Sequence, residues 1–173
     1  QYGYGTRQFE NTDSLFLKKR RVIDKGNTEV VAEYIKEMTG ADVFRIMPDK
    51  EYEKIQDYDE LVELTRIEHE NDERPTFNGK INDIGKYDTI FIGSPIWWYT
   101  FPQVMYTFLD SYDLNGKTII PFTTHEGSGL ADVVEVLRKY YPNATVAEGL
   151  AIRGRDAVKS KEKVVRWLEK TGF

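Results

Sequence analysis

Helix-like and strand-like patterns alternate from about residue 27 to the end of this sequence, without a linker, a repeat or a low-complexity tract between them. Such alternation is typical of a parallel α/β sheet, because each helix carries the chain back to the start of the next strand. A chain of 173 residues is long enough for one domain with a substantial core. We therefore expect a single α/β domain over residues 1–173, built on a doubly wound parallel sheet.

Apolar residues that recur every three to four positions predict the helices. In the stretch 58–71, Leu61, Leu64 and Ile67 fall on one face amid many acids, which predicts a surface helix with a solvated acidic face. The other helices are expected at 28–38, 102–109, 130–137 and 159–170.

Short apolar runs predict the strands. The run 87–93 shows little polar alternation, as expected for a strand covered on both faces, so we place it centrally in the sheet. A doubly wound sheet also needs a strand before the first helix. Residues 1–25 do not supply one, because the four cations Lys18 to Arg21 follow their short apolar run and would be costly to bury. Further strands are expected at 41–47, 117–123 and 145–152.

The composition restricts the possible chemistry. Without cysteine the chain has no disulfide, thiolate metal centre or cysteine nucleophile, so redox chemistry requires a bound cofactor. The net charge of −5 argues against a nucleic-acid partner. His69 has no second histidine near it, so no metal site is expected.

No apolar stretch approaches the roughly 20 residues that span a bilayer, and we expect a cytoplasmic protein with no membrane partner. The start at Gln1 leaves a leader or an upstream segment open.

Three loops are expected at the carboxyl edge of the sheet, where open α/β sheets bind their ligands. The first loop, 25–28, opens a helix whose free N–H groups favour a phosphate, and Asn27 or Thr28 can add a side-chain donor. An ordinary helix cap is the simpler explanation of this loop when it is taken alone.

The second loop, 93–102, follows the most apolar strand and carries Trp97, Trp98 and Tyr99. Aromatic faces stack on a flat tricyclic ring such as isoalloxazine, while backbone amides bond its polar edge. Either tryptophan alone could pack in the core. Two adjacent side chains cannot both point inward, so we expect at least one of them to serve a ligand.

The third loop, 123–129, combines glycines, which let the backbone approach a ligand closely, with hydroxyl side chains. His125 and Glu126 are candidates for moving protons to a reduced ligand. A solvated pair at the tip of a loop is the more common explanation, and we assign no catalytic residue.

Together, these segments resemble the flavodoxin family, and most of all the small bacterial flavodoxin-like proteins with an insertion in the first phosphate loop. The resemblance covers about residues 25–172. It rests on Lys-Gly-Asn-Thr-Glu-Val-Val-Ala at 25–32, Tyr-Asp-Thr-Ile-Phe-Ile-Gly-Ser-Pro-Ile-Trp-Trp at 87–98, the Gly-Lys-Thr to Gly-Ser-Gly-Leu segment at 116–130 and Gly-Leu-Ala-Ile-Arg-Gly at 149–154.

The resemblance implies a five-stranded sheet of order 2-1-3-4-5 that binds FMN at the ends of strands 1, 3 and 4. Residues 1–25 then correspond to the insertion and 26–173 to the matching core, with the first strand and the start of its phosphate loop expected upstream. The cofactor-binding residues that it implies are Gly26, Asn27, Thr28, Ser94, Pro95, Ile96, Trp97, Trp98, Tyr99, Thr124, His125, Glu126, Gly127, Ser128 and Gly129.

The function that the resemblance implies is that of an FMN-binding redox protein. It would either transfer electrons to a redox partner protein or use NAD(P)H to reduce quinone-like acceptors. A homodimer stays open, because a sheet without its first strand exposes edges that can pair. The alternative is a cofactor-free flavodoxin-fold module that binds another protein, or an incomplete fragment.

Overall fold

The computed structural model describes residues 25–173 except 51 and 56, without the side chain of Glu53. The expectations for residues 1–24, including a partner-binding role of the Lys18 to Arg21 run, lie outside the described residues. The α-helices are α1 (Asn27–Thr39), α2 (Tyr58–Glu70), α3 (Gln103–Ser111), α4 (Val133–Tyr140) and α5 (Lys161–Thr171). The strands are β1 (Met47–Pro48), β2 (Phe77–Asn78), β3 (Thr89–Pro95), β4 (Thr118–His125), β5 (Thr145–Val146) and β6 (Leu150–Arg153).

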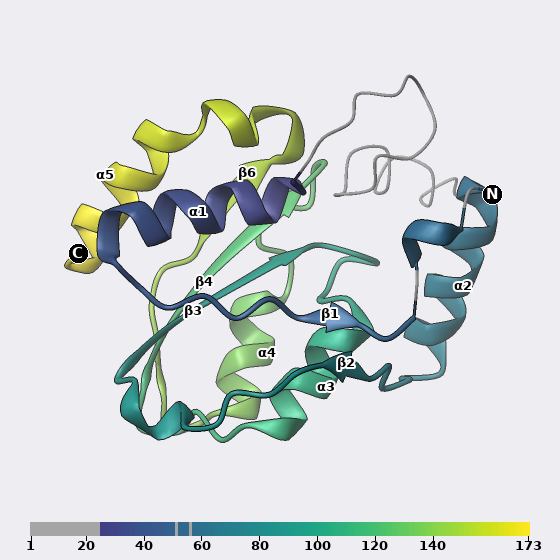
Figure 1. Cartoon of the computed structure of the whole chain (residues 1–173), viewed down its shortest axis with the longest axis horizontal. Coiled ribbons are helices and arrows are strands. Elements are labelled where there is room, and N and C mark those ends of the chain that lie inside the picture. Colours follow the sequence, from purple (N-terminus) through teal and green to yellow (C-terminus); the bar gives the residue numbers. More distant parts are fainter. Residues whose placement is uncertain (1–24, 51, 56) are drawn as a thin grey trace.

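The parallel sheet is organised around β4 (Figure 1). Strand β3 pairs with β4 along its whole length, from Thr89 opposite Thr118 to Pro95 opposite Thr124. On the other side, β5 pairs with the start of β4 and β6 with its end. The predicted α/β fold with a parallel sheet is confirmed. Among the described strands, however, the central position belongs to β4 and not to β3, which the sequence placed there.

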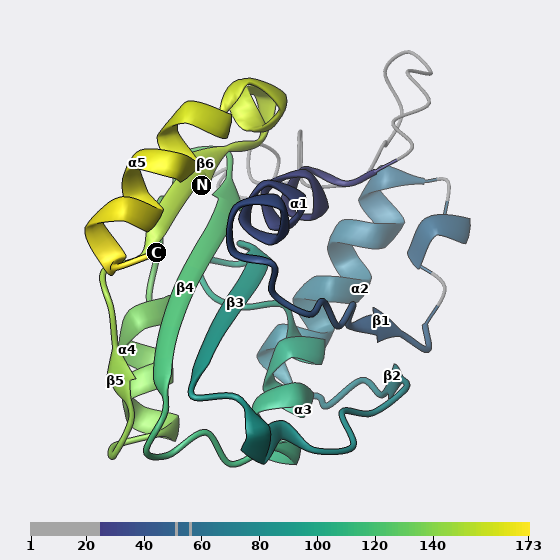
Figure 2. The same ribbon diagram turned by 60° about the vertical axis from the view of Figure 1, so that its left-hand side comes forward.

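Helices cover both faces of this sheet (Figure 2). Because successive residues of a strand point to opposite faces, Ile119 and Ile120 of β4 enter different core clusters. Ile119 packs with residues of α3 and α4, such as Phe108 and Leu137, whereas Ile120 packs with residues of α1 and α5, such as Val31. The near-continuous apolar pattern of the strands therefore reflects burial on both sides.

The strand predicted at 41–47 is wrong. Only Met47–Pro48 forms a strand, and it pairs antiparallel with β2 in a separate two-stranded sheet. An extended apolar pattern becomes a sheet strand only when a neighbouring strand accepts its hydrogen bonds, and residues 41–46 have no such neighbour among the described residues. The strand predicted at 145–152 is likewise divided into β5 and β6, with residues 147–149 between them.

Helix α2 forms where the sequence predicts it, but a different face is buried. Its N-terminus is capped by Asp57, whose carboxylate accepts the N–H groups of residues 59 and 60 at 2.8 and 3.1 Å. The buried residues are Leu61, Thr65 and Glu68, each 2% exposed, whereas Ile67 is 38% exposed. Polar partners contributed by other segments decide this orientation, as described below.

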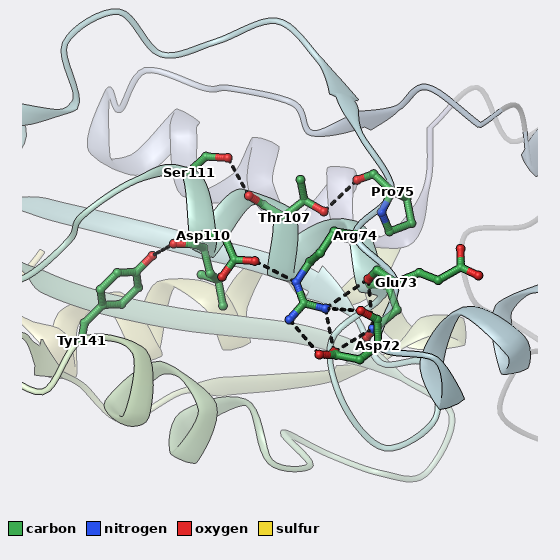
Figure 3. A network of polar contacts seen from close by, with 10 residues as sticks. Asp72, Glu73, Arg74, Pro75, Thr107, Asp110, Ser111 and Tyr141 are labelled. Atoms are coloured by element: carbon green, nitrogen blue, oxygen red, sulfur yellow. Dashed lines mark hydrogen bonds and ion pairs between the residues drawn. The ribbon is translucent and has the colours of Figure 1, made fainter.

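Arg74 fixes the chain after α2 to helix α3 (Figure 3). Its guanidinium donates to Asp72 at 2.6 Å and to Asp110 of α3 at 2.7 Å. Thr107 of α3 donates to the carbonyl of Pro75 at 2.8 Å. The C-terminal end of α2 is therefore held against the sheet layer through α3.

No helix in the described part of the chain has both the length and the apolar composition needed to cross a membrane.

Candidate functional site

The three loops predicted from the sequence meet at Thr124, the penultimate residue of β4. Its hydroxyl shares a hydrogen bond of 2.7 Å with the hydroxyl of Thr28 in the first loop. Its carbonyl accepts the backbone N–H of Ile96, in the second loop, at 3.0 Å. Because Thr124 is itself part of the third loop, one residue joins all three at the carboxyl edge of the sheet.

The first loop leads directly into α1. Gly26 is the N-cap residue, with an extended backbone, and it has no side chain with which to bond the N–H groups of the first helical turn. The acid of that turn, Glu29, pairs with Arg45 at 3.4 Å. A helix start without a side-chain cap, at the N-terminal end of a 13-residue dipole, is suited to hold an anion such as a phosphate.

The second loop contains a tight turn with an unusual backbone. Trp97 and Thr100 exchange both backbone hydrogen bonds at 3.0 Å. Between them, Trp98 and Tyr99 have φ values of 53° and 61°, both in the left-handed region. This is the pattern of a type I′ turn, which normally carries asparagine, aspartate or glycine at these positions. Bulky residues adopt this conformation at a cost of about 1–3 kcal/mol each, so surrounding contacts must hold it.

The side chains of the second loop differ in exposure. Ser94 and Ile96 are 1% exposed and belong to the protein interior, whereas Tyr99 is 53% exposed. The Trp98 indole donates from Nε1 to the hydroxyl of Thr65 at 3.2 Å. The Trp97 indole meets the ring of Tyr52 edge to face, with centroids 5.9 Å apart. Both tryptophans are therefore partly buried and in contact with residues outside their loop.

The third loop is held by its own backbone. The Thr123 hydroxyl donates to the carbonyl of Gly129 at 2.9 Å. Gly129 has φ of +64°, a conformation that suits glycine. At Gly127 and Gly129 a Cβ would meet nothing within 4 Å, so the described chain leaves open space beside this backbone. Ser128 lies between them and is partly buried.

His125 ends β4, and Glu126 follows it at the start of the glycine-containing part of the loop. The Nδ1 atom of His125 is buried and has no hydrogen-bond partner among the described residues. Burial, followed by the charges of Arg153 and Lys163, lowers the pKa of the His125 imidazole below its ordinary value. His125 is therefore neutral near pH 7, with a nitrogen available to bond a ligand.

We expect His125 to make the stability of the fold depend on pH. Because its folded pKa is lowered, the unfolded chain takes up the proton first as the pH falls. The stabilisation is therefore complete above about pH 6.5, the ordinary histidine pKa, and is lost as the pH falls toward the folded pKa. Thermal melts between pH 5 and 7.5 should show a shallower acid-side fall for His125→Asn than for the wild type. The matched control is His69→Asn, on the exposed side of α2; equal slopes for all three proteins would contradict the expectation.

The chain matches a known protein family and resembles solved structures of flavoproteins. The chain matches the Flavodoxin_4 family, described as flavodoxin, over residues 22–171. A structure from Bacteroides eggerthii, provisionally assigned as a flavoprotein, is 31% identical with a TM-score of 0.71, over 83% of this chain and 89% of that one. A structure from Bacteroides uniformis with the same provisional assignment is 30% identical with a TM-score of 0.71, over 82% and 90% of the two chains.

A more distant structure resembles this chain in fold. It is a flavoprotein from Lactobacillus acidophilus in complex with FMN, 20% identical with a TM-score of 0.59, over 76% of this chain and 89% of that one. None of the curated proteins matches the chain.

Proposed function

Because this chain belongs to the flavodoxin family, we propose that it binds FMN where its three loops meet and acts as a redox flavoprotein. The observation that carries the proposal is the junction at Thr124, which joins the N-terminus of α1, an aromatic turn and a glycine-containing loop. A phosphate, a flat aromatic ring and a polar ring edge are the parts of FMN that such groups bind.

The residues at the junction fit this cofactor. Gly26, Asn27 and Thr28 would hold the phosphate, because they lie at the N-terminus of α1, where backbone N–H groups and the helix dipole favour an anion. The buried Nδ1 of His125 would find its missing partner on the cofactor, in the space beside Gly127. The remaining contacts with the ring and its edge would come from Pro95, Trp97, Trp98, Tyr99, Thr124, Glu126, Ser128 and Gly129, whereas Ser94 and Ile96 lie in the interior and would support the loop.

Bound FMN accepts electrons from a donor and passes them to an acceptor, and the protein's task is to hold the ring and exclude water from it. The donor is either a redox partner protein or NAD(P)H, with a quinone-like molecule as the acceptor in the second case. We also propose that the sheet follows the flavodoxin order 2-1-3-4-5, with β3, β4 and β5/β6 at its last three positions.

The experiment is a titration of the purified protein with FMN and, in parallel, with riboflavin, which lacks the phosphate. Because free flavin absorbs in the same bands, unbound flavin is removed by gel filtration. We expect the protein fraction to keep absorption at about 370 and 450 nm, and FMN to bind at least about a hundredfold more tightly than riboflavin. Equal affinities would contradict the phosphate site in the first loop. A protein that stays colourless with both compounds would favour the cofactor-free module instead.

The same sample then distinguishes the two donors. Flavin reduction by NADH or NADPH alone, with turnover when a quinone is added, is expected for the reductase. A flavin that both nucleotides leave oxidised, but that dithionite reduces, would favour transfer between proteins.

A further inference from the structure

The inner face of α2 carries polar residues where a core helix normally presents apolar ones. Thr65 and Glu68 are both 2% exposed, and they point toward the second loop and its neighbours. A buried hydroxyl or carboxylate is destabilising unless it is paired, so its partners indicate why it is there. The acidic pattern of this helix predicts a solvated face, and the burial of Thr65 and Glu68 was not predicted. Periodicity does not show which polar residue finds a partner in the folded chain.

Glu68 fixes the residue that packs on Trp97. Its carboxylate accepts the hydroxyl of Tyr52 at 3.0 Å on both oxygens and the ammonium of Lys50 at 2.5 Å. Burial, followed by the charge of Glu68, raises the pKa of Tyr52, so this phenol stays protonated and keeps donating. The Tyr52 ring then meets Trp97 edge to face at 87°. This ion pair, in which the Glu68 carboxylate is buried and the Lys50 side chain is 41% exposed, therefore fixes the ring that packs on Trp97 of the second loop.

Thr65 contacts the second loop directly. Its hydroxyl donates to the carbonyls of Leu61 and Val62, at 3.0 and 3.1 Å, within its own helix. Its oxygen remains free to accept, and it accepts the Nε1–H of Trp98 at 3.2 Å. Trp98 is the first of the two residues held in the left-handed turn. A side-chain contact at this position is the kind of surrounding restraint that a strained turn requires.

We propose that Thr65 is a positioning residue for the flavin: its hydroxyl orients the Trp98 indole and so keeps the 97–100 turn in the conformation that meets the ring. Glu68, through Tyr52, supports the neighbouring Trp97. This inference rests on the proposed function, and it adds that the ring-binding turn takes its shape from helix α2, which lies outside the three loops.

The test uses three variants. Thr65→Val keeps the shape of the side chain but removes the acceptor, and Thr65→Ser restores the hydroxyl. The matched control is Thr171→Val: the Thr171 hydroxyl makes the same pair of helix contacts, to the carbonyls of Trp167 and Leu168 at 3.2 and 2.9 Å, but lies on α5. Any effect of losing such helix contacts appears in both valine variants.

Two readouts separate positioning from stability. Hydrogen exchange of the Trp98 indole N–H, followed by NMR without flavin, should be faster in Thr65→Val than in the wild type and Thr65→Ser. FMN affinity should fall about tenfold in Thr65→Val, the size expected for one lost hydrogen bond, and the flavin midpoint potential should shift. Thr65→Ser and Thr171→Val should keep wild-type affinity and potential.

The outcomes are distinguishable. If the wild type does not bind FMN, the proposed function fails. If the wild type binds FMN, and Thr65→Val matches it in affinity and potential, this inference is overturned while the proposed function stands. Equal losses in Thr65→Val and Thr171→Val would also overturn the inference, because they would show a general effect of helix stability.

Discussion

Replacing Gly93 by alanine should lower the free energy of unfolding by about 1–3 kcal/mol or more, as overpacking of a tight core does. Gly93 lies opposite Phe122 in the β3–β4 register. A Cβ on Gly93 would stand 2.0 Å from Cζ of the Phe122 ring and 2.4 and 2.6 Å from its two Cε atoms. Phe122 is 4% exposed and packs with Ile120 and Leu150, so the ring has little room to move away. Urea denaturation followed by circular dichroism measures the change.

Gly127→Ala is the matched control for this substitution. It adds the same methyl group where a Cβ meets nothing within 4 Å, and we expect a change near zero. The double variant Gly93→Ala with Phe122→Leu should recover part of the loss, because a smaller side chain removes the overlap. Equal denaturation midpoints for Gly93→Ala and Gly127→Ala would show that the close contact is not present.

Replacing Thr28 by aspartate should weaken FMN binding at least about a hundredfold, which corresponds to about 2.7 kcal/mol. The substitution places a carboxylate in the first turn of α1, where the phosphate is proposed to bind, so two negative charges compete for the same N–H groups. Aspartate near a helix N-terminus is favourable in the absence of a ligand, and its oxygen can still accept the Thr124 hydroxyl. We therefore expect FMN affinity to fall while stability stays near that of the wild type.

Riboflavin supplies the internal control for this variant, because it has the ring but no phosphate. Its affinity should change little in Thr28→Asp. Met38→Asp adds the same charge at a position that is 49% exposed, toward the other end of α1, and should leave FMN binding unchanged. A parallel loss of riboflavin binding in Thr28→Asp would instead indicate that the whole loop junction has been disturbed.

Local patterns predicted the helices well and the edge elements poorly. The helix predicted at 28–38 becomes α1, and the helix predicted at 130–137 overlaps α4, which begins at Val133. These predictions succeed because amphipathic periodicity depends on neighbouring residues in the chain. The predicted strand 41–47 failed for the opposite reason. Whether an extended segment joins a sheet depends on a partner that is distant in sequence, and its apolar residues Phe44 and Ile46 pack against the core without one.

The buried face of α2 shows the same limit at the level of one helix. Apolar spacing selected Leu61, Leu64 and Ile67, yet the helix buries Glu68 together with Leu61 and leaves Ile67 exposed. A glutamate can occupy such a position only when Tyr52 and Lys50 are brought to it. The sequence pattern does not predict this contact, because Lys50 and Tyr52 lie in the segment before α2 and reach Glu68 only in the folded chain.

The sequence by itself determined the fold class, the order of the main elements and the three loops that belong at the carboxyl edge of the sheet. Each of these depends on short-range periodicity, on glycine placement or on a local motif. Only the tertiary structure decided that Thr124 joins the loops, that Gly93 must lack a side chain opposite Phe122, and that Thr65 holds Trp98. These contacts join residues at least 28 positions apart, the separation of Ile96 and Thr124. Packing creates them, and no local preference of the chain encodes them.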